Sequence, residues 1–224
     1  MSTAAQGERL LQAAVRLGLE LESSQLAALL DYLALIQKWT KVYNLTAVRD
    51  ADEMLTHHLF DSLAVVVPLQ KQLAELQVMG VCGVSPRLLD VGSGAGLPGV
   101  VIAICCPTMT VHCVDTVGKK AAFIQQVAAN LKLANLRGIH ARVETLTEPY
   151  DVVSSRAFAS LADFTSWSEK ALAEKGVWMA MKGKHPAEEL SALPARVNVF
   201  HVEQLEVPGL DAERCVVWMR KRAG

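Results

Sequence analysis

The sequence predicts an α/β fold: a seven-stranded, mostly parallel sheet with an antiparallel edge, preceded by N-terminal helices. Two observations predict it. From Arg87 onward, apolar runs of strand length alternate with runs at helical spacing, as in a parallel sheet covered by helices. The last two strand-like runs have no helix between them, so we expect a hairpin at one edge of the sheet.

Residues 1–70 are expected to form a helical extension. Apolar residues recur at helical spacing over Leu26–Ile36, and either Ser23 or Ser24 is available as the N-cap of this helix.

A further helix is predicted to begin at Asp50 and to run toward Val67. Asp50 with Glu53 three residues later matches a capping box. From Gln70 to Pro86, glycine and proline interrupt the apolar pattern, so we expect an irregular connection into the sheet.

The sheet domain is expected to span residues 86–224 and to pack with the helical extension as one unit. Its predicted strands are Arg87–Val91, Thr110–Asp115, Leu136–His140, Asp151–Ser155, Gly176–Lys182, Asn198–Leu205 and Arg214–Arg220. Its predicted helices are Leu97–Cys105, Lys119–Leu131, Leu161–Ala173 and Pro186–Leu193.

A glycine-rich turn follows the first strand, within LLDVGSGAGLPG (Leu88–Gly99). Gly92, Gly94 and Gly96 give the turn conformational freedom and remove side chains that would hold a ligand away. The second strand ends in Asp115, and parallel strands bring such turns and acids together at their carboxyl edge. A carboxylate there can accept hydrogen bonds from both hydroxyls of a ribose. The glycine-rich turn together with Asp115 therefore predicts a cofactor that contains adenosine.

Two cofactors fit this turn differently. Gly94 to Gly99 matches the G-x-G-x-x-G pattern of dinucleotide binding, which would make the protein an NAD-dependent oxidoreductase. The frame from Gly92 is D-x-G-x-G-x-G, the form used for S-adenosylmethionine, in which Asp90 suits a cationic amino-acid tail and would repel phosphates. Pro98 also removes an N–H that a phosphate site needs. Because the predicted sheet is typical of class I S-adenosylmethionine-dependent methyltransferases (Rossmann-like) and unusual for dehydrogenases, we favour S-adenosylmethionine.

Two further segments are expected at the ligand edge. Val143 and Glu144 follow the third strand and can supply an apolar wall and an acceptor for adenine. At the end of the fourth strand, Ser154–Phe158 lacks the Asn-Pro-Pro-Tyr clamp of many amine methyltransferases, and no general base is evident. A ring nitrogen such as guanine N7 needs none, because its lone pair lies in the ring plane. Arg156 can bind the cofactor, a phosphate or the guanine edge, and Phe158 can stack on a base or pack in the core.

Basic residues are predicted to gather at the same edge. Lys182, Lys184 and Arg214 lie at strand ends and, with Arg142 and Arg156, would form a local cationic face for RNA phosphates. The chain has 22 basic and 23 acidic residues, so its net charge does not by itself indicate a nucleic-acid partner. Arg156, Lys182 and Arg214 are the candidates for positioning the substrate.

His57, His58, Asp61 and Ser62 contain the residue types of a hydrolase triad. They lie within two turns of one predicted helix, where side chains cannot converge as nucleophile, base and orienting acid. Packing of this helix against the cofactor edge is the better interpretation.

The composition excludes several other classes of site. The five cysteines have neither the C-x-x-C spacing of a metal site nor the pattern of a disulfide framework, so we expect no metal and a reducing compartment. The longest apolar run, Val100–Cys106, is too short to span a membrane, and charged residues interrupt the apolar pattern at the amino terminus. We therefore expect a cytoplasmic protein with no membrane partner.

Motifs across nearly the whole chain carry a family resemblance: YNLTAVRDADEML (43–55), HLFDSL (58–63), LLDVGSGAGLPGV (88–100), VDTVGKKAAFIQQV (114–127), ARVE (141–144), SRAFASL (155–161), MKGK (181–184) and VPGLDAER (207–214). With these, the chain resembles the RsmG (GidB) family of bacterial 16S ribosomal RNA guanine-N7 methyltransferases. The resemblance implies methyl transfer from S-adenosylmethionine to one guanine in the decoding-centre loop, with 16S rRNA or the small ribosomal subunit as partner. It implies cofactor contacts at Gly92, Leu97, Val143, Glu144 and Arg156. A ribosome-assembly factor that binds RNA and has a cofactor pocket without turnover is the alternative.

Overall fold

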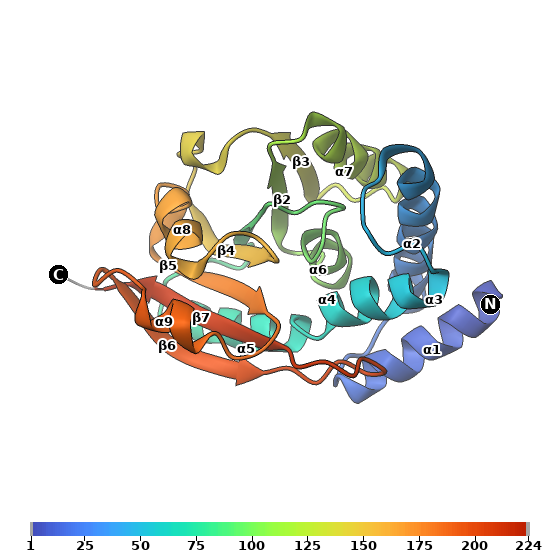
Figure 1. The fold of residues 1–224 in the computed structure, drawn as a ribbon, viewed down its shortest axis with the longest axis horizontal. Coiled ribbons are helices and arrows are strands. Elements are labelled where there is room, and N and C mark those ends of the chain that lie inside the picture. The colour runs from blue at the N-terminus through green and yellow to red at the C-terminus, as the bar shows by residue number, and fades with distance from the viewer. Residues whose placement is uncertain (1, 223–224) are drawn as a thin grey trace.

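The computed structural model describes residues 2–222 and contains one seven-stranded sheet in the order β3-β2-β1-β4-β5-β7-β6 (Figure 1). Strands β1 to β5 pair in parallel, whereas β7 pairs antiparallel with both β5 and β6. The predicted fold class is therefore confirmed. The strands are β1 Arg87–Val91, β2 Thr110–Asp115, β3 Leu136–His140, β4 Tyr150–Arg156, β5 Leu172–Lys182, β6 Val197–Gln204 and β7 Cys215–Lys221.

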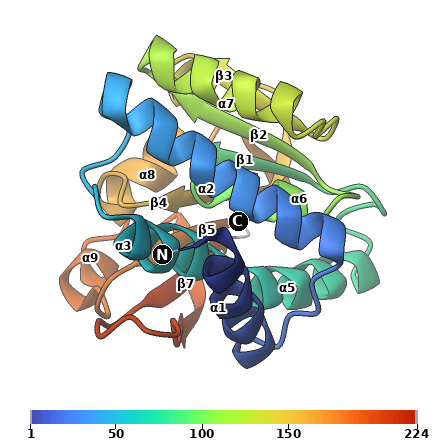
Figure 2. The same ribbon diagram turned by 90° about the vertical axis from the view of Figure 1, so that its right-hand side faces the viewer.

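Helices cover both faces of this sheet. They are α1 Thr3–Arg16, α2 Ser23–Tyr43, α3 Ala51–Met54, the π-helical turn η1 Leu55–Phe60, α4 Asp61–Leu63, α5 Val66–Val78, α6 Gly99–Cys105, α7 Gly118–Asn130, the 3-10 turn η2 Val143–Thr145, α8 Leu161–Trp167 and α9 Ala187–Ser191. Figure 2 shows α2 lying across one face, in front of α6, with α7 above it and α1 and α5 below. Helices α8 and α9 pack together on the opposite face.

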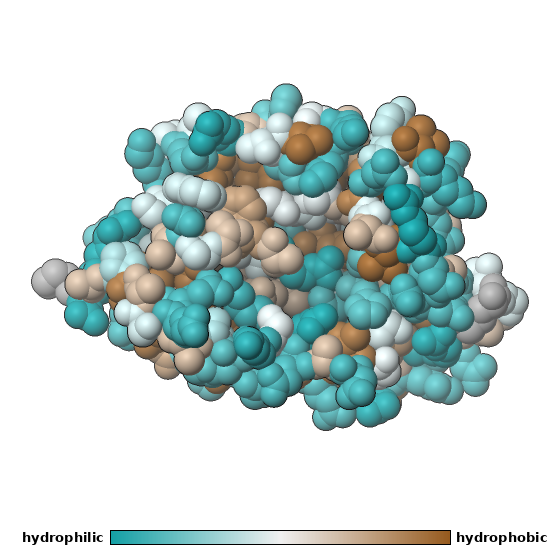
Figure 3. Space-filling view, in the orientation of Figure 1, coloured by the Kyte–Doolittle hydropathy of each residue, from teal (hydrophilic) through white to brown (hydrophobic). Residues whose placement is uncertain are grey.

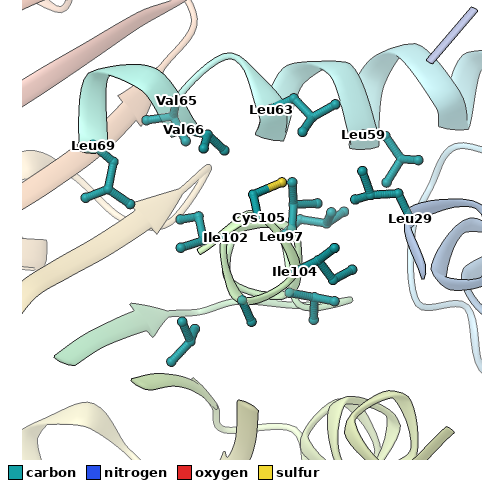
Figure 4. Close-up of a cluster of buried hydrophobic side chains, with 14 of the residues drawn as sticks. Leu29, Leu59, Leu63, Val65, Val66, Leu69, Leu97, Ile102, Ile104 and Cys105 are labelled. Atoms are coloured by element: carbon teal, nitrogen blue, oxygen red, sulfur yellow. The ribbon is translucent and has the colours of Figure 1, made fainter. Parts of the chain in front are cut away.

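Helix α6 lies at the centre of the larger hydrophobic core. All seven of its residues are buried, which explains why the sequence from Val100 to Cys105 is apolar throughout. Figure 4 shows Leu97, Ile102 and Ile104 around this helix, facing Leu29 of α2 and a row of residues from η1 to α5. Burial of each such aliphatic side chain stabilises the fold by about 1.5–3 kcal/mol. The N-terminal helices and the sheet thus share one core.

The N-terminal helices differ in detail from the prediction. The N-cap of α2 is Glu22, which forms a capping box with Gln25, and not Ser23 or Ser24. Asp50 does cap α3, since its carboxylate accepts from two backbone N–H groups in the first turn. The helix expected from there to Val67 is however divided by the π-helical turn and by a break before α5.

In two regions the predicted boundaries are wrong by four residues or more. The irregular connection was expected from Gln70, but α5 continues to Val78 because Leu73 and Leu76 pack into the core. The helix predicted to reach Ala173 ends at Trp167, and β5 already begins at Leu172, which is buried beside β4. In both places tertiary packing outweighs the local pattern. Within residues 2–222, no helix combines the length and the apolar character needed to cross a bilayer.

Candidate active site

A cavity of about 620 Å³ lies at the carboxyl edge of the parallel strands. The ends of β1 and β2, the turn η2, and Ala157, Phe158 and Trp167 line it. The sheet order reverses between β1 and β4, so this is the crevice in which open α/β sheets bind ligands. Figure 3 shows this face of the molecule hollowed at its centre, with both apolar and hydrophilic residues inside the hollow.

Asp115, at the end of β2, is the buried acid of this cavity. Its Oδ2 accepts from the Gly94 N–H at 3.0 Å and its Oδ1 from the Val117 N–H at 2.8 Å, while Lys120 Nζ lies 3.7 Å from Oδ2. A carboxylate has about four lone-pair sites, so two remain beyond these two hydrogen bonds. Asp115 can therefore accept from a pair of ligand hydroxyls.

The glycine-rich turn lies close beneath Phe158. Gly92 has φ +65°, and a Cβ at this position would lie only 2.8 Å from Phe158 Cγ. Phe158 in turn packs edge-on against Trp167, with ring centroids 5.9 Å apart. The residues on either side of Phe158, Ala157 and Ala159, both have positive φ. Such backbone strain persists only where surrounding contacts stabilise it. Here the strained backbone places the Phe158 side chain against the glycine-rich turn.

The same turn is held from the N-terminal helices. The Tyr32 hydroxyl, on α2, donates a 2.7 Å hydrogen bond to the Ala95 carbonyl oxygen. Tyr32 is fully buried, and this burial raises its pKa well above the ordinary value, so the phenol stays protonated and acts as a donor. Nothing in the local sequence pattern marks Tyr32, which reads as one more apolar position of α2.

Asp90 lies behind the turn and does not line the cavity. The Ser154 hydroxyl donates to its Oδ1 at 2.8 Å, and the Gly99 N–H donates to its Oδ2 at 3.0 Å. Burial raises the pKa of Asp90 to about 6. Both oxygens are thus used to tie β1 to β4 and α6. Asp90 therefore holds the turn in place from behind, and the contact with the amino-acid tail that the motif suggested stays a prediction.

The other expected cofactor residues divide into two groups. Gly92, Val143 and Glu144 line the cavity together with Asp115. Gly96 and Leu97 lie outside the cavity lining, and Leu97 packs in the core beside α6 (Figure 4). Gly94 reaches the site through its N–H bond to Asp115. Among the cavity residues that the sequence did not single out are Thr116, Lys120 and Trp167.

Four of the five predicted cationic side chains are paired with a carboxylate; Lys184 is the one for which the described residues show no such pair. Arg156 and Arg214 both bind Asp61, Lys182 binds Glu189 at 2.8 Å, and Arg142 binds Glu144 at 3.1 Å. Arg156 is not part of the cavity lining. The basic residues thus lie at the expected edge, but acidic side chains from other elements hold them in place.

Of the four residues with triad chemistry, His58 and Asp61 bind other side chains, and the buried Ser62 hydroxyl has no hydrogen-bond partner among the described residues. His58 Nε2 lies 2.9 Å from Thr46 Oγ1, while both oxygens of Asp61 bind arginine side chains. Burial and the nearby Arg156 lower the pKa of His58 to about 4, so its ring is neutral at pH 7. Among residues 2–222 there is also no cluster of three or more His, Cys, Asp or Glu side chains that could hold a metal ion.

This site and fold together define a class I S-adenosylmethionine-dependent methyltransferase. Solved structures share the fold: TrmN from Thermus thermophilus (TM-score 0.53, 19% identity, 75% of this chain and 53% of that chain) and a SAM-dependent methyltransferase from Aquifex aeolicus (TM-score 0.52, 17% identity, 79% and 96%). These likenesses support the fold alone.

The family follows from sequence comparison. The model of GidB, described as rRNA small subunit methyltransferase G, matches residues 25–217. Proteins named ribosomal RNA small subunit methyltransferase G are 70% identical in Albidiferax ferrireducens (92% of this chain, 93% of the relative) and 68% identical in Acidovorax ebreus (91% and 90%). The chain belongs to the GidB family, and it is an S-adenosylmethionine-dependent enzyme. The expected family, activity and cofactor are confirmed.

Proposed function

We propose that this enzyme transfers a methyl group from S-adenosylmethionine to N7 of one guanine in the decoding-centre loop of 16S rRNA. The names of the relatives support small-subunit rRNA as the substrate. The observation that supports binding of S-adenosylmethionine is the cavity bounded by Gly92, Asp115 and Glu144. The substrate is the RNA or the small ribosomal subunit in the cytoplasm.

The residues of the cavity fit the cofactor. Its volume of about 620 Å³ lies within the range of small-molecule sites. The two free acceptor positions of Asp115 suit the two ribose hydroxyls, Val143 offers an apolar surface for adenine, and Glu144 offers an acceptor. The Gly92 backbone gives close approach where any side chain would meet Phe158. When bound, S-adenosylmethionine supplies an electrophilic methyl group.

The chain's own residues have mainly to align the acceptor. Guanine N7 carries an in-plane lone pair and no proton, so orientation and removal of water suffice without a general base. His58 is neutral and hydrogen-bonded to Thr46, which is consistent with this requirement. The guanine must leave its stack to reach the cavity, and Phe158 or the 40%-exposed Trp167 at the cavity wall can stack on it.

The decisive experiment maps the product. Small-subunit RNA from a strain that lacks the modification is incubated with the enzyme and labelled S-adenosylmethionine, and the methylated nucleotide is located by mass spectrometry. We expect one N7-methylguanine in the decoding-centre loop. A methyl group on another base or another RNA would refute the proposed target, and binding without incorporation would favour the assembly-factor alternative.

The ribose assignment has its own test. Asp115→Ala removes the acceptor for the hydroxyls and frees the Gly94 and Val117 N–H groups, so we expect affinity for S-adenosylhomocysteine to fall by about 10- to 100-fold. Affinity for the RNA should change by less than about threefold. Titration calorimetry measures the first and filter binding the second, and an equal loss of both would contradict the assignment.

A further inference from the structure

Asp61 joins two arginine side chains that are far from it in sequence. Its Oδ2 binds Arg156 Nη1 at 2.7 Å, and its Oδ1 binds Arg214 Nε at 2.7 Å. The carboxylate belongs to a residue only 3% exposed, and the two guanidinium groups are themselves mostly buried. One acid from the N-terminal helices thus links the end of β4 to the residue that precedes β7.

The backbone beside Asp61 takes part in the same arrangement. The π-helical turn η1 ends immediately before Asp61, and the carbonyl oxygen of His57 within it accepts a 2.9 Å hydrogen bond from Arg156 Nη1. Inserted π turns are frequent at functional sites. Arg156 Nη1 therefore has both of its hydrogens committed to the segment around Asp61, which determines the plane of its guanidinium group.

The hydrogen bonds leave several donors of the pair unused. A guanidinium has five N–H donors; Arg156 uses its Nη1 pair, and Arg214 uses Nε for Asp61 and Nη1 for the Glu213 carbonyl oxygen. Among residues 2–222, the Nη2 group of each has no hydrogen-bond acceptor. One carboxylate between two guanidinium groups also leaves a net charge of about +1. Two planar donor groups at a fixed separation with net positive charge are suited to a phosphodiester group.

We propose that Asp61 is a positioning residue for methyl transfer: it holds Arg156 and Arg214 so that their remaining donors together seat one phosphate of the substrate RNA. The proposal rests on the proposed function and deepens it, since it assigns the phosphate contact of the same site. Asp61 acts through the arginines and does not itself touch the RNA. This role explains why an acidic residue is buried at the edge of the sheet where the RNA, a polyanion, is expected to bind.

The first test is Asp61→Asn, which preserves size but can accept on only one oxygen. We expect KM for the unmethylated small subunit to rise about 10-fold or more, and affinity for S-adenosylhomocysteine to change by less than about threefold. Asp151→Asn is the matched control, because Asp151 is a half-buried carboxylate at the opposite end of β4 that accepts from the Arg87 N–H. Both variants are assayed below their melting transitions. An equal change of KM in the two variants would overturn the proposal.

A double-mutant cycle separates positioning from a general structural effect. In an Arg214→Ala background the second guanidinium is absent, so Asp61→Asn should raise KM by less than about threefold further. Full additivity of the two substitutions would overturn the proposal.

Arg214→Lys covers the case in which Asp61→Asn does not fold. It keeps the charge and an ion pair with Asp61 but loses the planar donor set, so we expect KM for the small subunit to rise at least fivefold. An unchanged KM would show that bulk charge alone matters and would refute the inference. Methylation by the unsubstituted enzyme is measured in parallel, so that a failure of the proposed function is recognised independently.

Discussion

Replacement of Gly92 by alanine tests how the glycine-rich turn and Phe158 share space. Gly92 has φ +65°, and an added Cβ would lie 2.8 Å from Cγ and 3.0 Å from Cε2 of the Phe158 ring. Gly94 provides the matched control, because its φ is +59° but an added Cβ meets no atom within 4 Å. Both variants carry backbone strain, and only Gly92→Ala carries the overlap with the ring.

The structure sets the size of both effects. A left-handed conformation costs a residue with a Cβ about 1–2 kcal/mol, which both variants carry. Overpacking against Phe158 adds about 1–3 kcal/mol at Gly92. For a chain of this length, each kcal/mol lowers the melting temperature by about 2–4 °C. Gly94→Ala should therefore lose about 2–8 °C, and Gly92→Ala about 4–20 °C. Only the Gly92→Ala methyl group meets the Phe158 ring. Because this ring lines the cavity, Gly92→Ala should also displace it from the ligand site.

Urea unfolding of the four members of a Gly92→Ala, Phe158→Ala cycle measures the overlap directly. Without the ring, Gly92→Ala should cost only its backbone strain, so we expect a coupling free energy of about 1–3 kcal/mol. Titration with S-adenosylhomocysteine follows the ligand site in the same proteins. A coupling below about 0.5 kcal/mol, or a larger loss of stability in Gly94→Ala, would refute the reasoning.

Two further predictions concern groups behind the site. Burial raises the pKa of Asp90 from 3.8 to about 6, so on lowering the pH the folded state binds a proton before the unfolded state does. Protonation of Asp90 therefore stabilises the folded state. This stabilisation is complete below about pH 4 and is lost as the pH rises through 6. Asp90→Asn should remove it, and urea unfolding from pH 4 to 7 should show the wild type losing stability relative to the variant as pH rises; a constant difference would contradict this. Tyr32→Phe leaves the Ala95 carbonyl oxygen without its donor and should cost about 1–3 kcal/mol, with weaker binding of S-adenosylhomocysteine. Calorimetry checks both effects, and an unchanged melting temperature would exclude the proposed restraint.

The interior strands were predictable because their signals are local. Strands β1, β2 and β3 have the predicted bounds, since each is a short run that ends at a turn residue or at a change of pattern. The bounds of α5 and α8 were not predictable, because Leu73 and Leu172 have similar apolar character whether they lie in a helix, a strand or a loop. Only their packing partners distinguish these cases.

The sequence by itself determined the cofactor edge: the glycine turn after β1 and Asp115 at the end of β2 are each defined by a few neighbouring residues, and parallel pairing of β1 with β2 brings them together. Only the tertiary structure decided how the substrate edge is organised. Asp61 meets Arg156 and Arg214 across 95 and 153 residues of chain, and Tyr32 meets Ala95 across 63. Such pairs depend on which helix covers which strand end, and that choice is made by burial of the whole core, which no local spacing encodes.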